Sequence, residues 1–332
     1  MFNLKFKKLF GFLGLFALIF TTLSGQSFAK KHPTYAQKVC KGQIQVVIHA
    51  SYGGGTDTTA RMMSIRTRRT LNTDIQIVGK RGGSGAKAQN YTLTRPKDGC
   101  TIMALTESHL YTMARGKSNM KINDLVGVAR AMEEPTFVVV NAKNKELSTV
   151  KKMIKRAQKK PISVAIASIG GTEHIGMYSY SKAANIPFKA VSFGSGAQSL
   201  QALASGKVEA SLLNPSEAAA LIADKKIKAI VLLHDKALAD YPKVKTSYSM
   251  GHKVKVVTTR GYAVLKGTPQ SVIDEISKGM VKAMKHETFG NYLKGASLDP
   301  ATSPAGTKVW DKQLKENYKK AAAALKGLGL TK

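Results

Sequence analysis

Cysteine and histidine are sparse in this chain of 332 residues, and neither is grouped as a metal site requires. The two cysteines, Cys40 and Cys100, have no histidine at ligand spacing nearby. The seven histidines form neither an H-E-x-x-H motif nor another tight cluster. The sequence therefore predicts no metal site, and we expect no cofactor.

Long apolar runs are also absent beyond residue 29. The run at residues 9–23 is shorter than the roughly 20 residues that a membrane span needs. It follows lysines at the start of the chain and ends before Ser27-Phe28-Ala29, which is typical of an export signal with its cleavage site. No cysteine stands near that site, so lipid attachment there is not expected. We expect residues 1–29 to be removed and the mature protein to be soluble and exported; the alternative is a retained N-terminal anchor.

Acidic residues are few, 20 against 52 basic ones, and the predicted mature chain keeps a formal charge of +29. Such a charge favours anionic partners. The lysines are scattered, however, without interleaved aromatic residues or a recognisable nucleic-acid module. We therefore expect a solvated basic surface that concentrates small acids, and no nucleic-acid partner.

The motifs of nucleotide-binding and hydrolytic enzymes are incomplete. Gly116-Lys117-Ser118 lacks the earlier glycine of a phosphate loop, where Tyr111 stands instead. Residues 83–88 match the dinucleotide pattern G-x-G-x-x-A, but they follow the second predicted strand and indicate a tight turn. Ser84 lacks the last glycine of a hydrolase elbow, and nothing marks a base and an acid for Ser195. The sequence favours a binding protein over an enzyme.

Strand-like and helix-like runs alternate with short turns, which is typical of α/β layers with mainly parallel sheets. Strands are expected at residues 44–50, 75–78 and 101–105, and again at 162–167, 188–192, 209–213 and 227–233. The β-branched run at 136–140 and the runs at 254–259 and 261–265 suit two crossings between domains. We expect lobe 1 to comprise residues 30–140 and 258–332, and lobe 2 residues 141–257. A ligand cleft would lie between them, lined by the turns after the strands.

The most informative turn is the one at residues 51–57, between the strand at 44–50 and a helix at 58–71. Its three glycines let the backbone turn tightly and approach a bound group closely. The helix start that follows leaves unpaired N–H groups, which would point at that group. The sequence therefore predicts an anion cradle here. Similar glycine turns follow later strands at residues 168–174 and 193–197.

For three features the sequence leaves two interpretations open. Asp57 either caps the helix start, which the sequence favours, or faces the cleft and selects an ammonium group. His174 opens a helix behind Gly170-Gly171 and is either a site residue or a helix-start residue. Cys40 and Cys100 each stand just before a predicted strand, and they are either bonded to one another, which an oxidising compartment favours, or free.

Across most of the mature chain the sequence resembles the substrate-binding receptors of tripartite tricarboxylate transporters, also called the Bordetella uptake gene family. Gly53-Gly54-Gly55-Thr56-Asp57 matches a family pattern of glycine turn and Thr-Asp, and Lys80-Arg81-Gly82-Gly83-Ser84-Gly85 resembles its Asn-Arg-Pro-Gly-Ala-Gly stretch. Asp98-Gly99, Gly170-Gly171-Thr172-Glu173-His174 and Gly267-Thr268-Pro269 follow in the family's order.

The resemblance implies a type II periplasmic binding fold, each lobe a mainly parallel sheet flanked by helices, that closes on a small carboxylate. It implies a non-enzymatic periplasmic receptor, monomeric, that delivers this ligand to the membrane permease subunits of the transporter. The ligand-binding residues that it implies lie in three turns: Ser51, Tyr52, Gly53, Gly54, Gly55, Thr56 and Asp57; Ser168, Gly171, Thr172 and His174; Phe193, Gly194, Ser195, Gly196 and Ala197.

Asn214 joins this set because it stands where the family commonly has an acidic residue. Loss of that acid argues against an amino-acid ligand and for a plain or aromatic acid. Two other functions remain open from the sequence: a periplasmic sensory receptor that signals to a membrane kinase, and a periplasmic hydrolase.

Overall fold

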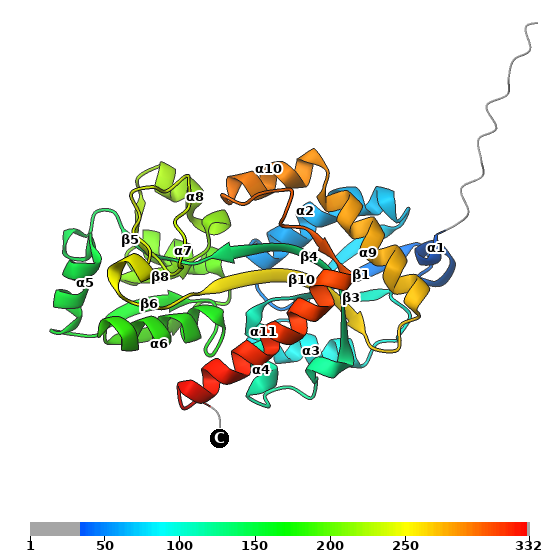
Figure 1. Cartoon of the computed structure of the whole chain (residues 1–332), viewed down its shortest axis with the longest axis horizontal. Coiled ribbons are helices and arrows are strands. Elements are labelled where there is room, and N and C mark those ends of the chain that lie inside the picture. The colour runs from blue at the N-terminus through cyan, green and yellow to red at the C-terminus, as the bar shows by residue number, and fades with distance from the viewer. Residues whose placement is uncertain (1–33, 331–332) are drawn as a thin grey trace, which may run out of the picture. The chain divides into compact units, whose positions relative to one another are not determined.

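The computed structural model describes residues 34–330, in which two β-sheets are each flanked by helices (Figure 1). The predicted export signal at residues 1–29 lies outside the described residues. No helix of the described part is both long enough and apolar enough to cross a membrane. The helices are α1 (Tyr35–Val39), α2 (Gly55–Thr70), α3 (Ala86–Leu93), α4 (Glu107–Ala114), α5 (Val150–Ala157), α6 (Thr172–Ala184), α7 (Gly196–Ala204), α8 (Pro215–Ala223), α9 (Gln270–Met284), α10 (Glu287–Gly295) and α11 (Thr307–Gly327).

The first sheet has six strands in the order β11-β4-β10-β3-β1-β2. Strand β1 pairs in parallel with β2 and β3, whereas β10 is antiparallel to β3 and β4, and β11 is antiparallel to β4. Its strands are β1 (Gln43–Ile48), β2 (Asp74–Gly79), β3 (Thr101–Leu105), β4 (Leu125–Pro135), β10 (Val257–Leu265) and β11 (Ala305–Gly306).

The second sheet has five strands in the order β7-β6-β8-β5-β9. Strand β6 is parallel to β7 and β8, and β5 is antiparallel to β8 and β9. Its strands are β5 (Phe137–Asn141), β6 (Ile162–Ile166), β7 (Phe188–Ser192), β8 (Ala210–Leu213) and β9 (Ile227–Leu232).

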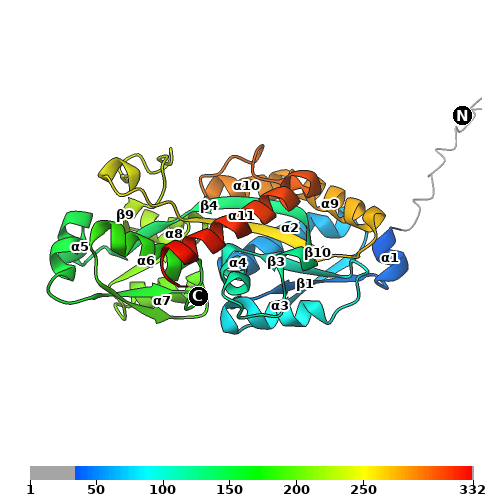
Figure 2. The same cartoon turned by 60° about the horizontal axis from the view of Figure 1, so that its bottom comes forward.

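Both sheets are mixed, so the expectation of mainly parallel sheets needs correction. The reason lies in the two crossings. The chain leaves the first sheet through β4, which runs directly into β5, and it returns through β10 (Figure 1). An outgoing and a returning strand that lie side by side must run in opposite directions, and β4 and β10 pair along their whole length. Helix α11 lies along β4 in the first sheet (Figure 2).

Each sheet has a hydrophobic core on both faces, because successive strand residues point to opposite sides. In β1, Val46 packs in one core with Met63 of α2 and Met280 of α9. Its neighbour Val47 packs in the other core with Leu314 of α11. The second sheet is likewise covered by α5 and α6 on one face and by α7 and α8 on the other.

Trp310 of α11 explains two glycines in the crossing strands. Its indole is 1% exposed and donates from Nε1 to the Tyr262 carbonyl oxygen at 3.0 Å. A Cβ on Gly261 would lie 2.3 Å from the indole, and one on Gly127 would lie 2.8 Å from it. Both positions must therefore lack a side chain so that α11 can approach the sheet.

The structure joins Cys40 to Cys100 in a disulfide, with the two Cα atoms 5.3 Å apart. Cys40 follows α1, and Cys100 directly precedes β3, which pairs with β1. The bond therefore ties the first helix of the described chain to the central strands of the first sheet.

Reduction of this disulfide should destabilise the first sheet. The cysteines are 60 positions apart, and the chain-entropy model gives about 4 kcal/mol for a loop of that size. We expect the free energy of unfolding, measured by urea titration, to fall by about 2–4 kcal/mol when dithiothreitol is added. The C40S/C100S double variant should match the reduced protein and not respond to the reductant. Equal stability of all three samples would contradict this role.

Candidate functional site

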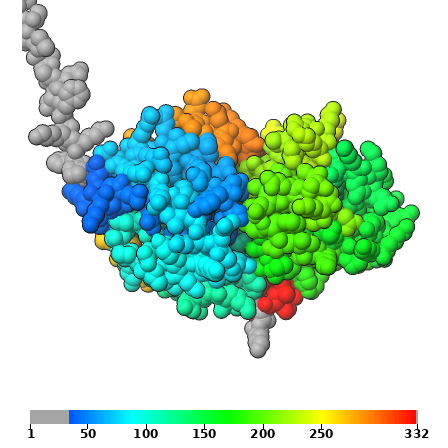
Figure 3. Space-filling model, turned by 180° about the vertical axis from the view of Figure 1, so that it is seen from behind, coloured from blue at the N-terminus to red at the C-terminus, as the bar shows by residue number. Residues whose placement is uncertain are grey.

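A cavity of about 910 Å³ lies between the two sheets and is lined by residues of both. Seen from behind in Figure 3, the N-terminal segments in blue and cyan meet the green segments of the second sheet along one seam. The lining comprises His49, Ala50, Ser51, Gly55, Thr56, Arg81, Gly82, Gly83, Ser84, Gly85, Thr106 and Ser108 on one side, Ala167, Ser168, Ile169, Thr172, Glu173, Ser192, Phe193, Gly194, Ser195, Gly196, Gln198 and Glu217 on the other, and Thr258 and Arg260 of β10.

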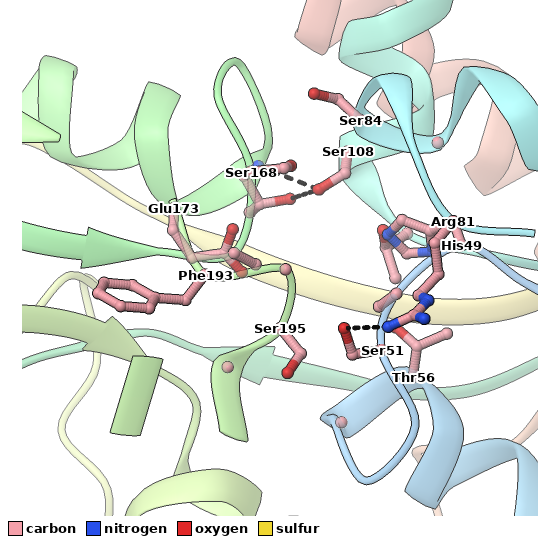
Figure 4. A pocket seen from close by; sticks show the side chains of 18 of the residues that line it. His49, Ser51, Thr56, Arg81, Ser84, Ser108, Ser168, Glu173, Phe193 and Ser195 are labelled. Carbon is pink, nitrogen blue, oxygen red and sulfur yellow. Dashed lines mark hydrogen bonds between the residues drawn. The ribbon is translucent and has the colours of Figure 1, made fainter. Parts of the chain in front are cut away.

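The three glycine turns singled out from the sequence all reach this cavity. The residues that line it are Ser51, Gly55 and Thr56 from the first turn, Ser168 and Thr172 from the second, and Phe193, Gly194, Ser195 and Gly196 from the third. Figure 4 shows the first and third turns facing one another. Eight residues of the implied set are not part of the lining: Tyr52, Gly53, Gly54, Asp57, Gly171, His174, Ala197 and Asn214.

Close approach explains the glycines of the first turn better than ligand contact does. A Cβ on Gly54 would lie 2.8 Å from the Ser195 Cβ, and one on Gly55 would lie 2.3 Å from a guanidinium nitrogen of Arg260. The Ser51 N–H donates to the Gly194 carbonyl oxygen at 3.2 Å. The first and third turns are thus in direct contact, and bulkier residues would separate them.

The N–H groups expected to hold a ligand anion are partly occupied by the protein's own carboxylates. The Gly53 N–H donates to Asp57 at 2.8 Å, and the Gly55 N–H, at the start of α2, donates to Glu217 at 3.2 Å. Glu217 belongs to α8, which covers the second sheet. Its carboxylate therefore lies at the start of α2, a helix that covers the first sheet. The helix start favours an anion, and here that anion is a side chain.

Asp57 lies in the first turn of α2, whose N-cap is Gly54, and it bonds to the loop that precedes the helix. Its carboxylate is 3% exposed, accepts the Gly53 N–H, and pairs with Arg61 at 2.9 Å. It lies beneath the turn and outside the cavity lining. His174 likewise stabilises its own turn, because Nδ1 accepts the Gly170 N–H at 2.8 Å. Burial, aided by nearby Arg115, lowers the pKa of His174, so the ring stays neutral in this role.

Asn214 lies behind the cavity, where it positions an arginine. It caps the start of α8, and its side-chain amide donates to the Pro135 carbonyl oxygen at 2.9 Å. Its side-chain oxygen accepts from the guanidinium of Arg260 at 3.2 Å. Asn214 therefore links the outgoing crossing strand β4 to the returning strand β10.

Arg260, which we did not anticipate, is the buried cation at the base of the cavity. It is 5% exposed, donates to Glu134 at 3.2 Å and to Thr56 at 3.3 Å, and lies 3.9 Å from Glu217. Burial opposes its charge, but Glu134 and Glu217 raise its pKa, so Arg260 remains a cation. A lone arginine in an apolar strand was the available signal.

Arg81 is the second cation of the lining, and no acid of residues 34–330 forms an ion pair with it. It is exposed, and its guanidinium donates to the Ser51 hydroxyl at 3.3 Å (Figure 4). Ser51 also bonds to Gln198 of α7 at 3.1 Å. The glycine turn that contains Arg81 was assigned from sequence to a tight turn, and the fold places it beside the turns at residues 51–57 and 193–197.

Two titratable side chains of the lining have strongly shifted pKa values. Burial, aided by the charge of Arg260, lowers the pKa of His49 to about 4, so the imidazole is neutral. Burial raises the pKa of Glu173 to about 7, and the nearby Glu217 adds to this effect. Glu173 was part of the family motif in the sequence but was not chosen as a site residue.

The arrangement suits binding rather than hydrolysis. The Ser195 hydroxyl accepts the Gln198 N–H at the start of α7, and the Ser84 hydroxyl donates to the Ile169 carbonyl oxygen at 2.6 Å. Neither serine is bonded to a histidine, which is the contact that activates a nucleophile. Within residues 34–330 no three His, Cys, Asp or Glu side chains gather as metal ligands would.

A second cavity, of about 1010 Å³, lies on the other side of β10. Strand alternation separates the two: Thr258 and Arg260 line the first, and Val257 and Thr259 line the second. Much of its remaining wall is the polar face of α11. Of the turns after β1, β6 and β7 its lining contains only Thr172, so it is the weaker candidate.

Comparison with known proteins agrees with the fold and the family. BugD, a periplasmic binding protein of known structure, matches with a TM-score of 0.81 at 19% identity, over 87% of this chain and 98% of BugD. MatC from Rhodopseudomonas palustris, solved with bound malate, matches with a TM-score of 0.79 at 20% identity, over 85% of this chain and 98% of MatC. The type II periplasmic binding fold is thereby confirmed.

The protein BugT of Bordetella pertussis is 23% identical over 252 residues, which cover 73% of this chain and 76% of BugT. The TctC model, described as the tripartite tricarboxylate transporter family receptor, matches residues 59–330. That match begins after the turn at residues 51–57, and it covers the other two turns, Arg81 and Arg260. The chain therefore belongs to the TctC family of receptors, which are periplasmic solute-binding proteins and not enzymes.

Proposed function

We propose that this receptor captures a small organic carboxylate in the first cavity and delivers it to the membrane permease subunits of a tripartite transporter. In this proposal residues 1–29 direct export, and the monomeric chain has two lobes, residues 30–140 with 258–332 and residues 141–257. The observation that carries the proposal is a cavity between the two sheets in which Arg81 has no acid partner among the described residues.

Arg81 is the group best suited to bind the ligand's carboxylate. The other cation, Arg260, already has Glu134 and Glu217 beside it. A guanidinium can donate two parallel hydrogen bonds to a carboxylate, and hydroxyls add further donors. Ser51 lies 3.3 Å from Arg81, and Ser195 lines the opposite wall. The bound malate of MatC, a relative with the same fold, supports a carboxylate as the ligand class.

Closure of the two lobes is supported by hydrogen bonds that join residues of lobe 1 to the turn at residues 168–174 of lobe 2. Ser108 of α4 bonds to the Thr172 hydroxyl at 3.1 Å and accepts the Thr172 N–H at 3.1 Å. Ser84 donates to Ile169, and Arg115 donates to Gly170 at 3.0 Å. These bonds lie at one rim of the cavity, where they stabilise the closed arrangement that encloses a ligand.

Replacement of Arg81 should weaken carboxylate binding strongly. Loss of a hydrogen bond to a charged group costs about 1.5–3 kcal/mol, which is roughly a tenfold to hundredfold rise in Kd. We expect this for Arg81→Ala, and roughly a fivefold rise for Ser51→Ala, which loses one neutral hydrogen bond. Isothermal titration calorimetry follows a thermal-shift screen of mono-, di- and tricarboxylates.

Arg95→Ala is the matched control, because Arg95 stacks on Tyr91 outside the cavity. It removes one positive charge without touching the site, so its Kd should equal that of the unchanged protein. If Arg81→Ala and Arg95→Ala bind the ligand equally well, Arg81 is not the carboxylate's partner.

Removal of the Thr172 hydroxyl should weaken binding by loosening closure. Thr172→Val keeps the branched shape and loses the bond to Ser108, which is worth about 1 kcal/mol. A smaller closed population raises the apparent Kd in proportion, here roughly fivefold. Ser179→Ala, whose hydroxyl bonds only within α6, serves as the control. Identical titrations of the two variants would argue against a contribution of this rim.

A further inference from the structure

Glu173 is a half-buried residue of the lining whose carboxyl group the proposed carboxylate anchor leaves unused. It is the second residue of α6 and lines the cavity on the side of the second sheet (Figure 4). Its Oε2 atom is buried and has no hydrogen-bond partner. No cation of residues 34–330 forms an ion pair with it.

A further unpartnered polar atom lines the same cavity, Nδ1 of His49, just after β1. Buried polar groups almost always have partners, and one left without a partner costs about 1–3 kcal/mol. Two such atoms around one cavity indicate that the missing partners belong to the ligand.

The charges around Glu173 decide which partner suits it. Glu217 and Arg260 act on it electrostatically, and Glu173 in turn acts on Tyr111. Arg260 is already bonded to Glu134, and Glu217 is a second acid, so neither offers Glu173 a free positive charge. His49 is neutral. A second ligand carboxylate placed here would meet a like charge, whereas a hydroxyl or ammonium group would supply the missing donor.

We infer that Glu173 determines specificity: the ligand is a small acid with one carboxylate, whose other end carries a hydrogen-bond donor that binds Glu173. The inference rests on the proposed function and adds the ligand's second functional group. The donor is a hydroxyl or an ammonium group, and both are acceptable to a carboxylate. A plain dicarboxylate is disfavoured.

Four acids that differ only at the far end test this directly: butyrate, 4-hydroxybutyrate, 4-aminobutyrate and succinate. The corresponding three-, five- and six-carbon series are included, and the length that binds best is used. Titration calorimetry at pH 8 keeps Glu173 mostly ionised, because burial raises its pKa only to about 7. We expect the hydroxyl or the ammonium ligand to bind at least tenfold more tightly than butyrate, and succinate no more tightly than butyrate.

Glu173→Gln is the matched variant, since it keeps the size and one acceptor oxygen and loses the charge. In this variant the hydroxyl or ammonium ligand should bind only a few-fold more tightly than butyrate, and the Kd of succinate should fall. Glu173→Ala should abolish the preference, while Arg81→Ala should weaken all four acids by a similar factor and keep their order. Whichever of the hydroxyl and ammonium ligands binds more tightly shows which of these two groups Glu173 selects.

Succinate as the tightest ligand of the unchanged protein, or an order of affinities that survives Glu173→Ala, would overturn the inference and leave a carboxylate receptor in place. Binding of none of the four acids at any length, with Arg81→Ala indistinguishable from the unchanged protein in the wider screen, would overturn the proposed function as well. A variant that fails to fold is recognised by its thermal unfolding, and Glu173→Gln then carries the test.

Discussion

The buried ion pair between Arg260 and Glu134 is the constraint on which the rest of the site depends. The two residues lie on β10 and β4, the strands that cross between the sheets, and both side chains are almost wholly buried. Breaking such a pair leaves an uncompensated charge and is strongly destabilising. Through Thr56, Asn214 and the nearby Glu217, the same guanidinium fixes the start of α2 and the start of α8. Helices of both sheets are thereby positioned from one point.

This network separates the charge of the chain from the charge of its cavity. The sequence has a formal charge of +32, yet acidic and basic side chains nearly balance around the cavity. Long-range attraction by the surface can bring many small anions to the protein. In our proposal, discrimination among them depends on a few local groups, above all Arg81 and Glu173. Attraction and selection are performed by different residues, so each can change without the other.

Local signals predicted much of the fold, and long-range partnerships explain what was missed. Strand β3 and the three glycine turns could be located because strand propensity and turn residues are read within a few positions. Strand β4 was not among the expected strands, because Gly127, Arg130 and Glu134 interrupt its apolar pattern. Two of these residues have distant partners, since Gly127 makes room for Trp310 and Glu134 pairs with Arg260. Arg260 offered only the local signal of a lone arginine in an apolar strand, since its partner Glu134 lies 126 positions away. The disulfide was foreseeable because it depends on two strand positions alone.

Trp310 is the one tryptophan of the chain, and its indole rests on the backbone of Gly127 and Gly261. Arg260 directly precedes Gly261 in β10. Any bending of the crossing strands must change the surroundings of this ring, because no side chain separates it from them. The molecule thus carries its own optical probe of any bending of these strands, whose emission can be followed in rapid mixing without attaching a dye.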